Sequence, residues 1–202
     1  MSLNKKRSTS NAISGGGAPA PTVAAFAPGA PGSPLAYIND NTKSSVDFSG
    51  NCTAGNTVDL QVTDSASMAI NPSHLTCGAG GTYSFSNVDL TSLAEGALAV
   101  LVTEVPLSGG TSGTATDALT KDTISPVLTG LGNTTTPAKT RNWSWGCTDA
   151  GSSNTCTYRF VAPGTSATGT PTGAFSSTAA ASQLSGDGTY YVHVEARDAA
   201  GN

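Results

Sequence analysis

Residues 96–102 read Gly-Ala-Leu-Ala-Val-Leu-Val, and this run carries the clearest fold signal in the chain. Its branched apolar side chains Leu98, Val100 and Val102 recur at every second position. Because successive side chains of a strand point to opposite faces, this alternation predicts a β-strand with one buried face.

The same pattern returns later in the chain with a constant spacing. Tyr190, Val192 and Val194 lie 92 residues after the three alternating positions of the first run. Ser33-Pro34 likewise returns as Ser125-Pro126, again 92 residues later. Two anchors that agree on one offset predict an internal repeat, and about 90 residues is the size of one immunoglobulin-like sandwich.

Composition agrees with an all-β fold. The 202 residues include 24 glycines and only 11% charged residues, so long amphipathic helices are not expected. Short strands separated by Gly, Asn, Ser and Thr turns suit this composition better. Other alternating apolar runs lie at residues 46–48, 58–62, 83–85, 143–147 and 156–160. We therefore predict two tandem immunoglobulin-like antiparallel β-sandwiches.

The repeat sets the expected domain boundaries. Residues 1–33 are rich in Gly, Ala and Pro, which predicts a flexible N-terminal tail. The two sandwiches are expected at residues 34–124 and 125–202. The last strand expected in the first sandwich, near residues 113–122, has its counterpart 92 residues later, past Asn202. The second sandwich is therefore expected to lack its last strand, leaving an unpaired sheet edge in a fragment of a longer protein.

Several motifs resemble the bacterial immunoglobulin-like (Big-type) tandem repeats of large surface or secreted adhesin-like proteins. They include Phe48-Ser-Gly50-Asn-Cys52, Val58-Asp-Leu-Gln-Val62-Thr-Asp64, Lys121-Asp122-Thr-Ile-Ser-Pro126 and the turn Asp198-Ala-Ala-Gly201-Asn202. The resemblance covers roughly residues 35–202. It implies sandwich architecture, neighbouring repeats in the same chain and a location at the cell surface or outside the cell. It does not imply a ligand, because such modules serve as spacers in some proteins and as binders in others.

Charge and motifs argue against several function classes. The net charge of −4 and the lack of a Lys/Arg cluster beyond residues 5–7 argue against nucleic-acid binding. No run approaches the ~18 apolar residues of a membrane helix, and no signal peptide is recognisable. The histidines His74 and His193 lack a nucleophile motif, and no G-x-S-x-G elbow occurs. The sequence predicts a protein that is not an enzyme and is not inserted in a membrane.

The four cysteines fall two per repeat. Cys52 and Cys77 lie in the first unit, and Cys147 and Cys156 lie in the second. Zinc sites usually carry a close C-x-x-C pair, which this sequence lacks. We predict two structural disulfides, one within each unit. Disulfides persist in oxidising compartments, so the cysteines also predict an exported protein.

The sequence predicts no cofactor, and calcium is the alternative. Asp117 and Asp122 lie near the boundary between the two units. Calcium takes six to eight oxygen ligands, and the carboxylates here are sparse. We therefore predict no metal site, with calcium held by Asp117 and Asp122 as the alternative.

Trp143 and Trp145 are the most distinctive pair in the second unit. They stand two positions apart, so both face one side of the expected strand together with Cys147. Core burial of at least one Trp is the favoured interpretation, because this architecture can pack a Trp on a disulfide in its core. The alternative is an exposed aromatic pair that contacts a ligand by stacking on sugar rings.

The sequence favours the first of three functions, and the other two are alternatives. The first is a non-catalytic stalk or spacer in an adhesin-like array. The second is a recognition module that binds a cell-surface glycan or protein through loops or through the Trp strand. The third is an accessory domain of a secreted hydrolase.

Overall fold

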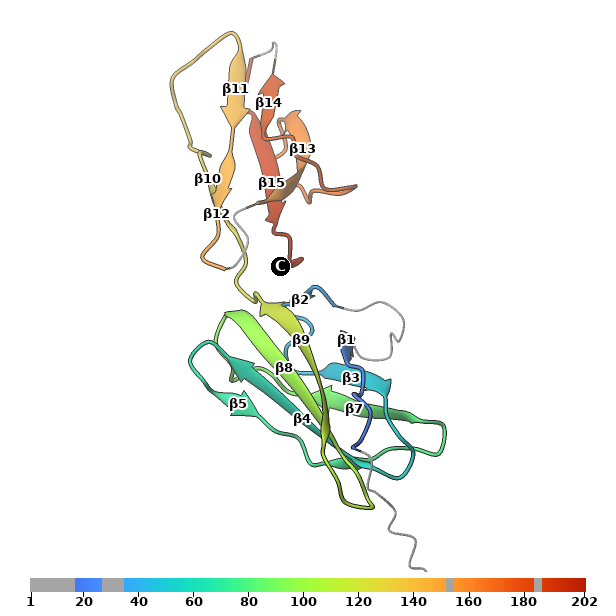
Figure 1. Cartoon of the computed structure of the whole chain (residues 1–202). Coiled ribbons are helices and arrows are strands. Elements are labelled where there is room, and N and C mark those ends of the chain that lie inside the picture. The colour runs from blue at the N-terminus through green and yellow to red at the C-terminus, as the bar shows by residue number, and fades with distance from the viewer. Residues whose placement is uncertain (1–16, 27–34, 152–154, 184–186) are drawn as a thin grey trace, which may run out of the picture.

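The computed structural model describes residues 17–26, 35–151, 155–183 and 187–202. These residues form strands and no helix, arranged as two β-sandwich units placed end to end (Figure 1). None of them forms a helix that is long and apolar enough to cross a membrane. The all-β prediction is confirmed.

The first unit consists of two sheets. One has the strand order β1-β3-β7, and the other has the order β2-β9-β8-β4-β5, with β6 also paired to β4. Among the strands that the structure describes in this unit, only the β2–β9 pair is parallel. The strands are β1 (Ala24–Phe26), β2 (Tyr37–Ile38), β3 (Val46–Asn51), β4 (Thr57–Asp64), β5 (Ala69–Ile70), β6 (Leu75–Thr76), β7 (Thr82–Val88), β8 (Gly96–Val105) and β9 (Gly113–Lys121).

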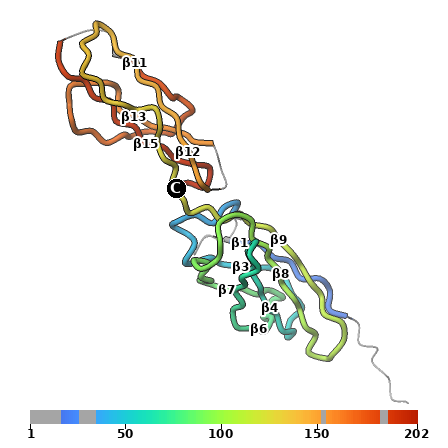
Figure 2. The backbone as a smooth tube through the Cα atoms, turned by 90° about the vertical axis from the view of Figure 1, so that its left-hand side faces the viewer, coloured from blue at the N-terminus to red at the C-terminus, as the bar shows by residue number. Residues whose placement is uncertain are grey.

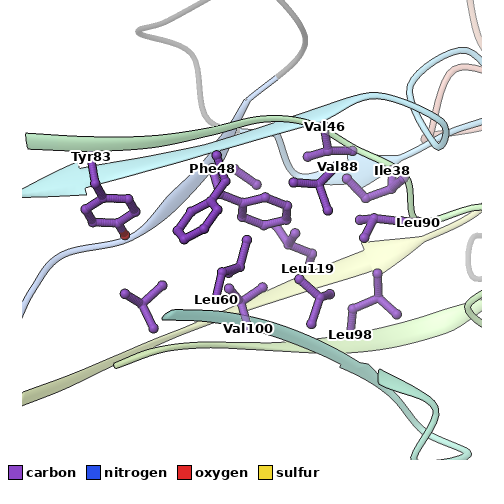
Figure 3. Packing of buried hydrophobic residues seen from close by; sticks show 14 of the residues in the cluster. Ile38, Val46, Phe48, Leu60, Tyr83, Val88, Leu90, Leu98, Val100 and Leu119 are labelled. Atoms are coloured by element: carbon purple, nitrogen blue, oxygen red, sulfur yellow. The ribbon is translucent and has the colours of Figure 1, made fainter. Parts of the chain in front are cut away.

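Alternation along the strands builds the first core. The run that opens β8 buries Leu98, Val100 and Val102 against the opposite sheet. Phe48 of β3 is fully buried and meets them from the other side (Figure 3). In register, Leu60 lies opposite Val102 on the neighbouring strand. The period-two pattern of the sequence therefore corresponds to the inward faces of the two sheets.

The N-terminal segment differs from the expected flexible tail over residues 1–33. Its described part, residues 17–26, lies along the first unit, and β1 pairs antiparallel with β3. The Tyr83 hydroxyl donates to the carbonyl of Thr22. A Cβ on Gly50 would lie 1.8 Å from that carbonyl oxygen, so only glycine allows this close approach. The free edge of β3 thus orders a segment whose composition alone predicts disorder. Residues 1–16 and 27–33 of the expected tail lie outside the described residues.

The second unit has shorter strands and smaller sheets. They are β10 (Val127–Thr129), β11 (Arg141–Ser144), β12 (Gly146–Thr148), β13 (Thr157–Gly164), β14 (Ala180–Gln183) and β15 (Tyr191–Arg197). They form three antiparallel pairs, β10–β12, β11–β14 and β13–β15.

Strand register relates the two units. Thr57 of β4 lies opposite Val105 of β8, and Thr157 of β13 lies opposite Arg197 of β15. From the first unit to the second, the first residue of the earlier strand shifts by 100 positions, from 57 to 157. The last residue of the later strand shifts by 92 positions, from 105 to 197. The 92-residue offset therefore holds for the β8/β15 strands, while the segment between the paired strands is 8 residues shorter (100 − 92) in the second unit.

The edge strands also differ between the units. β8 is flanked by both β4 and β9, whereas β15 pairs only with β13 among the described residues. The expectation that a further strand completes the second sandwich stays a prediction.

The second core is much smaller than the first. Its buried apolar side chains are Trp145, Tyr158 and Ala200. The Trp145 ring meets Tyr158 edge-on at 6.4 Å and Phe160 at 5.2 Å between ring centroids. Since large aromatic side chains dominate the burial of apolar area, this one indole is the centre of the second unit.

Asp64, at the end of β4, links the pH dependence of stability to one turn of the first unit. Its Oδ1 accepts hydrogen bonds from the amides of Ala66 and Met68, both at 2.9 Å, and its Oδ2 accepts one from the Ala94 amide at 2.7 Å. These bonds, that of Ala94 first, hold the pKa of Asp64 below its usual value of 3.8.

Replacing Asp64 by asparagine is therefore expected to destabilise the first unit at neutral pH. A carboxyl with a lowered folded-state pKa stabilises the fold above its unfolded pKa, and this contribution is lost as pH falls through the folded value. The difference in unfolding free energy between wild type and Asp64→Asn should shrink below about pH 4. Denaturant melts between pH 7 and pH 2.5 measure it, with the exposed Asp59→Asn of the same strand as control. A difference that does not change with pH would contradict the assignment.

Candidate metal centre

The two units meet through a short linker and the C-terminal turn. The Asp122 amide donates to the carbonyl of Ile38 at 2.8 Å and so fixes the start of the linker to the first unit. The Asn39 side chain donates to the carbonyl of Ala200 at 2.8 Å, from the first unit to the second. In Figure 1 the C-terminal end of the chain accordingly lies beside β2 and the end of β9.

Asn202 bridges the two units through its side-chain amide. Its Nδ2 donates to the carbonyl of Asp122 at 2.7 Å, and its Oδ1 accepts from the Asp40 amide at 3.0 Å. The turn that holds Asn202 is organised by Asp198, whose Oδ1 accepts from the amides of Gly201 at 2.7 Å and Asn202 at 2.9 Å. Gly201 has a φ of 93°, which favours glycine. The D-x-x-G-N sequence is therefore a junction-forming turn.

Three carboxylates converge at this junction. Asp122, Asp149 and Asp198 each offer an oxygen, and these oxygens lie within 4.8 Å of one another. Asp122 comes from the linker, Asp149 from the loop after β12, and Asp198 from the C-terminal turn. Asp122 is 0% exposed and Asp198 is 5% exposed. Segments far apart in the sequence thus place three acids in one partly dry space.

The residues around Asp149 and Asp122 fit closely against their carboxylates. The Oδ2 atom of Asp149 is buried and has no hydrogen-bond partner among the described residues, while its Oδ1 accepts from the Gly151 amide at 2.9 Å. A Cβ on Gly151 would lie 2.0 Å from Oδ1 of Asp122. Any side chain at position 151 would therefore clash with the Asp122 carboxylate, and glycine avoids the clash. One carboxylate oxygen of Asp149 has no hydrogen-bond partner among the described residues.

Electrostatics at this site favour a cation. Carboxylates at such separations repel one another, and the repulsion grows as water is excluded. In the described part of the chain, no Lys or Arg forms an ion pair with Asp149 or Asp198. An all-oxygen donor set suits calcium or magnesium rather than zinc or copper. The residues present therefore fit a hard divalent cation.

The sequence located only part of this centre. Asp122 is in the cluster, but Asp117 is not: it lies in β9 opposite Val100, and its Oδ1 accepts from the Ala118 amide at 2.8 Å. Sequence reasoning did not name Asp149 or Asp198 as ligands. The D-x-x-G-N turn was the available signal for Asp198, while nothing in the sequence around Asp149 pointed to the junction.

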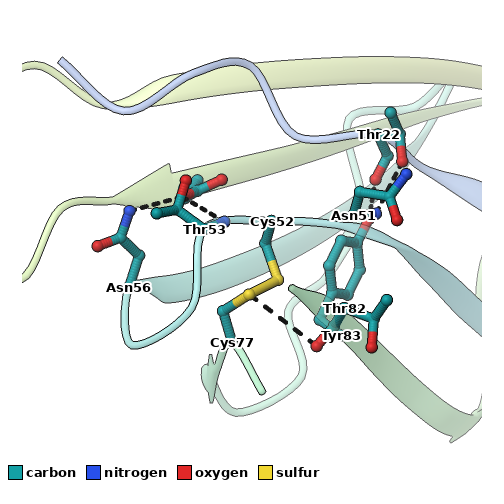
Figure 4. The surroundings of a disulfide bond; sticks show 9 residues. Thr22, Asn51, Cys52, Thr53, Asn56, Cys77, Thr82 and Tyr83 are labelled. Atoms are coloured by element: carbon teal, nitrogen blue, oxygen red, sulfur yellow. Dashed lines mark hydrogen bonds between the residues drawn. A yellow bond between two sulfur atoms is a disulfide. The ribbon is translucent and has the colours of Figure 1, made fainter. Parts of the chain in front are cut away.

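The cysteines pair as predicted. Cys52 joins Cys77 in the first unit, and Cys147 joins Cys156 in the second. The first disulfide ties the chain after β3 to the chain after β6 and lies close to Tyr83 (Figure 4). No free cysteine occurs among the described residues.

The tryptophans separate into two environments. Trp145 is 6% exposed and packs in the core, in line with the favoured interpretation of at least one buried Trp. Trp143 is only half-buried and lies in β11 opposite Ala181 of β14. Trp145 itself falls in the break between β11 and β12, where the chain passes from one strand pair to another.

No protein-family model and no curated protein matches the chain. Among solved structures, it is similar to a tetra-tandem repeat in the extending region of a large adhesion protein, with 24% identity, a TM-score of 0.43, and coverage of 91% of this chain and 46% of that one. A bacterial immunoglobulin-like domain of the M. primoryensis ice-binding adhesin matches with 23% identity and a TM-score of 0.33, over 52% of this chain and 98% of that one.

A further match is a calcium-stabilised adhesin with which an Antarctic bacterium binds ice. It has 21% identity and a TM-score of 0.33, over 71% of this chain and 36% of that one. At these identities and scores the fold assignment rests on the strand pairing of this chain rather than on the matches. The three solved structures named above are described as parts of a large adhesion protein and of ice-binding adhesins.

Proposed function

We propose that the chain is a non-catalytic spacer, a pair of consecutive modules in an extracellular adhesin-like array. The observation that carries the proposal is the built junction between the units, where Asn202 and Asn39 make direct hydrogen bonds across the boundary. Figure 2, turned by 90° from Figure 1, shows the two units again end to end along one axis. A spacer needs this arrangement, because its length depends on a fixed angle between neighbours.

Calcium at the junction would complete this role. Asp122, Asp149 and Asp198 would hold the ion, with water or carbonyl oxygens supplying the other ligands that calcium requires. The bound ion would neutralise the repulsion among the carboxylates. Because the ligands come from both sides of the boundary, the same ion would stiffen the hinge between the units.

The two disulfides support an extracellular setting, since such bonds persist in oxidising compartments. The neighbouring repeats of the same chain are the partners that this role requires. Pro126 restricts the backbone of the linker and so favours a semi-rigid connection.

Calcium titration into the chelator-treated protein tests the junction. We expect one calcium per chain and, at about 100 times Kd, a gain of about 2.7 kcal/mol in unfolding free energy. Small-angle scattering should show a narrower distribution of maximum dimensions when calcium is bound, because the hinge is locked.

Asp149→Asn provides a sharper test, because it keeps the shape of the side chain and removes one charge. In calcium the variant should be less stable than wild type and should bind the ion about tenfold or more weakly. In chelator the order should be reversed or equal, since the variant has less repulsion. Asp117→Asn, outside the cluster, is the matched control and should follow wild type in both conditions. Identical behaviour of Asp149→Asn and wild type in calcium would refute the metal centre.

A further inference from the structure

A cavity of about 790 Å³ opens in the second unit, at the end farthest from the junction. It lies between the loop of residues 132–138 and the chain that leads into β15. Figure 1 shows the β10–β11 connection reaching this far end, where β11 begins. The volume is within the range of about 300–1,000 Å³ that is typical of small-molecule sites.

One wall of the cavity comes from β11. Arg141 and Trp143 stand two positions apart and share one face of the strand, the face that continues to Trp145 in the core. Trp145 is covered by Tyr158 and Phe160, whereas Trp143 and Arg141 are only half-buried. The inward face of β11 therefore leaves the packed core and continues as a cavity wall with an aromatic ring and a cation.

The opposite wall and the rim are polar and aromatic. Tyr190 and Tyr191 line the cavity where the chain enters β15, and Thr134–Thr136 line it from the facing loop. The hydroxyl groups of these residues can donate and accept hydrogen bonds. Aromatic walls with hydroxyl groups around them suit a ligand that has an apolar face and a polar edge.

Arg141 gives the cavity its charge preference. No carboxylate of the described residues forms an ion pair with Arg141, and its Nε is buried without a hydrogen-bond partner among them. A guanidinium in this state favours a carboxylate ligand, with which it forms two parallel hydrogen bonds. Asp187 is the one acid among the described residues of the lining. It disfavours polyanions and can accept hydrogen bonds from ligand hydroxyls.

We propose that this cavity binds a sugar residue that carries one carboxylate, such as a uronic or sialic acid of a surface polysaccharide. Arg141 takes the carboxylate, and the Trp143 ring covers the apolar C–H face of the pyranose, which gains from leaving water. Asp187 and the loop threonines take the ring hydroxyls. The site is at the opposite end of the unit from the carboxylate cluster and so adds a recognition role that does not depend on calcium.

Binding of D-glucuronic acid and N-acetylneuraminic acid to the full chain tests the proposal, measured by saturation-transfer NMR and calorimetry. The buffer contains chelator, so that failure of the metal centre and failure of the cavity are read separately. We expect saturable binding of at least one acid, and binding of its methyl ester at least about tenfold weaker, because the ester has no anion for Arg141. No saturable binding of either acid up to about 10 mM would overturn the proposal, and so would equal binding of acid and ester.

Variants of the wall identify the site. Arg141→Gln should lose the preference for the acid over the ester, and Trp143→Ala should weaken both ligands by about tenfold or more. Trp143→Phe retains a ring and should retain binding, which guards against a loss of fold in the alanine variant. Arg159→Gln is the charge-matched control, since Arg159 is already paired with Glu195 at 2.8 Å, away from the cavity lining. Full acid preference in Arg141→Gln would place binding elsewhere and refute the assignment.

Discussion

Replacing Trp145 by alanine is expected to unfold the second sandwich and leave the first one folded. The side chain is 6% exposed and joins Tyr158 and Phe160 in a core with few other large members. Truncation of a buried Trp to Ala typically costs about 3–5 kcal/mol through lost burial and the cavity left behind. A module of no more than about 80 residues rarely draws more than about 3–5 kcal/mol from its core, so this loss approaches the whole of it.

Denaturant unfolding followed by far-UV circular dichroism and by amide NMR measures the effect. Wild type should show both sandwiches folded, and the variant should retain only the resonances of the first unit without denaturant. Trp143→Ala is the matched control, because that ring is half-buried at the cavity wall and should cost about 1 kcal/mol. If Trp145→Ala keeps both sets of resonances and the wild-type midpoint, the indole is not the centre of this core.

Removal of the Cys52–Cys77 disulfide is expected to cost the first unit about 3.5 kcal/mol. The cysteines are separated by 25 residues, and the loop-entropy relation gives this value for a loop of that length. For Cys147–Cys156, separated by 9 residues, the same relation gives about 2.6 kcal/mol. The double variants Cys52→Ala/Cys77→Ala and Cys147→Ala/Cys156→Ala, compared by denaturant melts, test both values.

Loss of Cys147–Cys156 costs less free energy than loss of Cys52–Cys77, but it should unfold its unit more completely. The first unit retains its large core around Phe48 without the disulfide, whereas the second depends mainly on Trp145. Thiol titration of the denatured, unreduced wild type is the accompanying control and should find no free thiol. Four titratable thiols would remove both the stability prediction and the argument for an oxidising compartment.

Much of the fold could be predicted because it follows from local patterns. Alternation at Leu98, Val100 and Val102 predicts the buried face of β8, and two cysteines per repeat predict the disulfides. These features depend on strand geometry and on the repeat, both of which are visible in one sequence. The segment around Ala24–Phe26 could not be predicted, because its order comes from the open edge of β3 rather than from its own composition.

The candidate site was harder to predict, because it is assembled across a boundary. Asp122 was identified by its place in the linker, and Asp117 was grouped with it only because it is near in sequence. Strand β9 instead keeps Asp117 opposite Val100, while Asp149 and Asp198 arrive from distant segments. The spacing of residues along the chain does not predict that these three carboxylates come together, because their proximity depends on how the two units contact each other.

The parallel pair β2–β9 has a mechanical consequence. Gly17 and Ala18 lie beside Thr111, at the β8–β9 hairpin, whereas β9 leads out to Asp122 at the opposite pole of the first unit. Once the β1–β3 pair had separated, tension along the array would pull β2 and β9 past each other in opposite directions, along their common axis. The backbone hydrogen bonds of this pair, whose register sets Tyr37 beside Thr120 and Ile38 beside Lys121, would carry that load in shear and together. Rupture in shear requires several bonds to fail at once, so the first unit is built to resist stretching along the direction in which an array would be pulled.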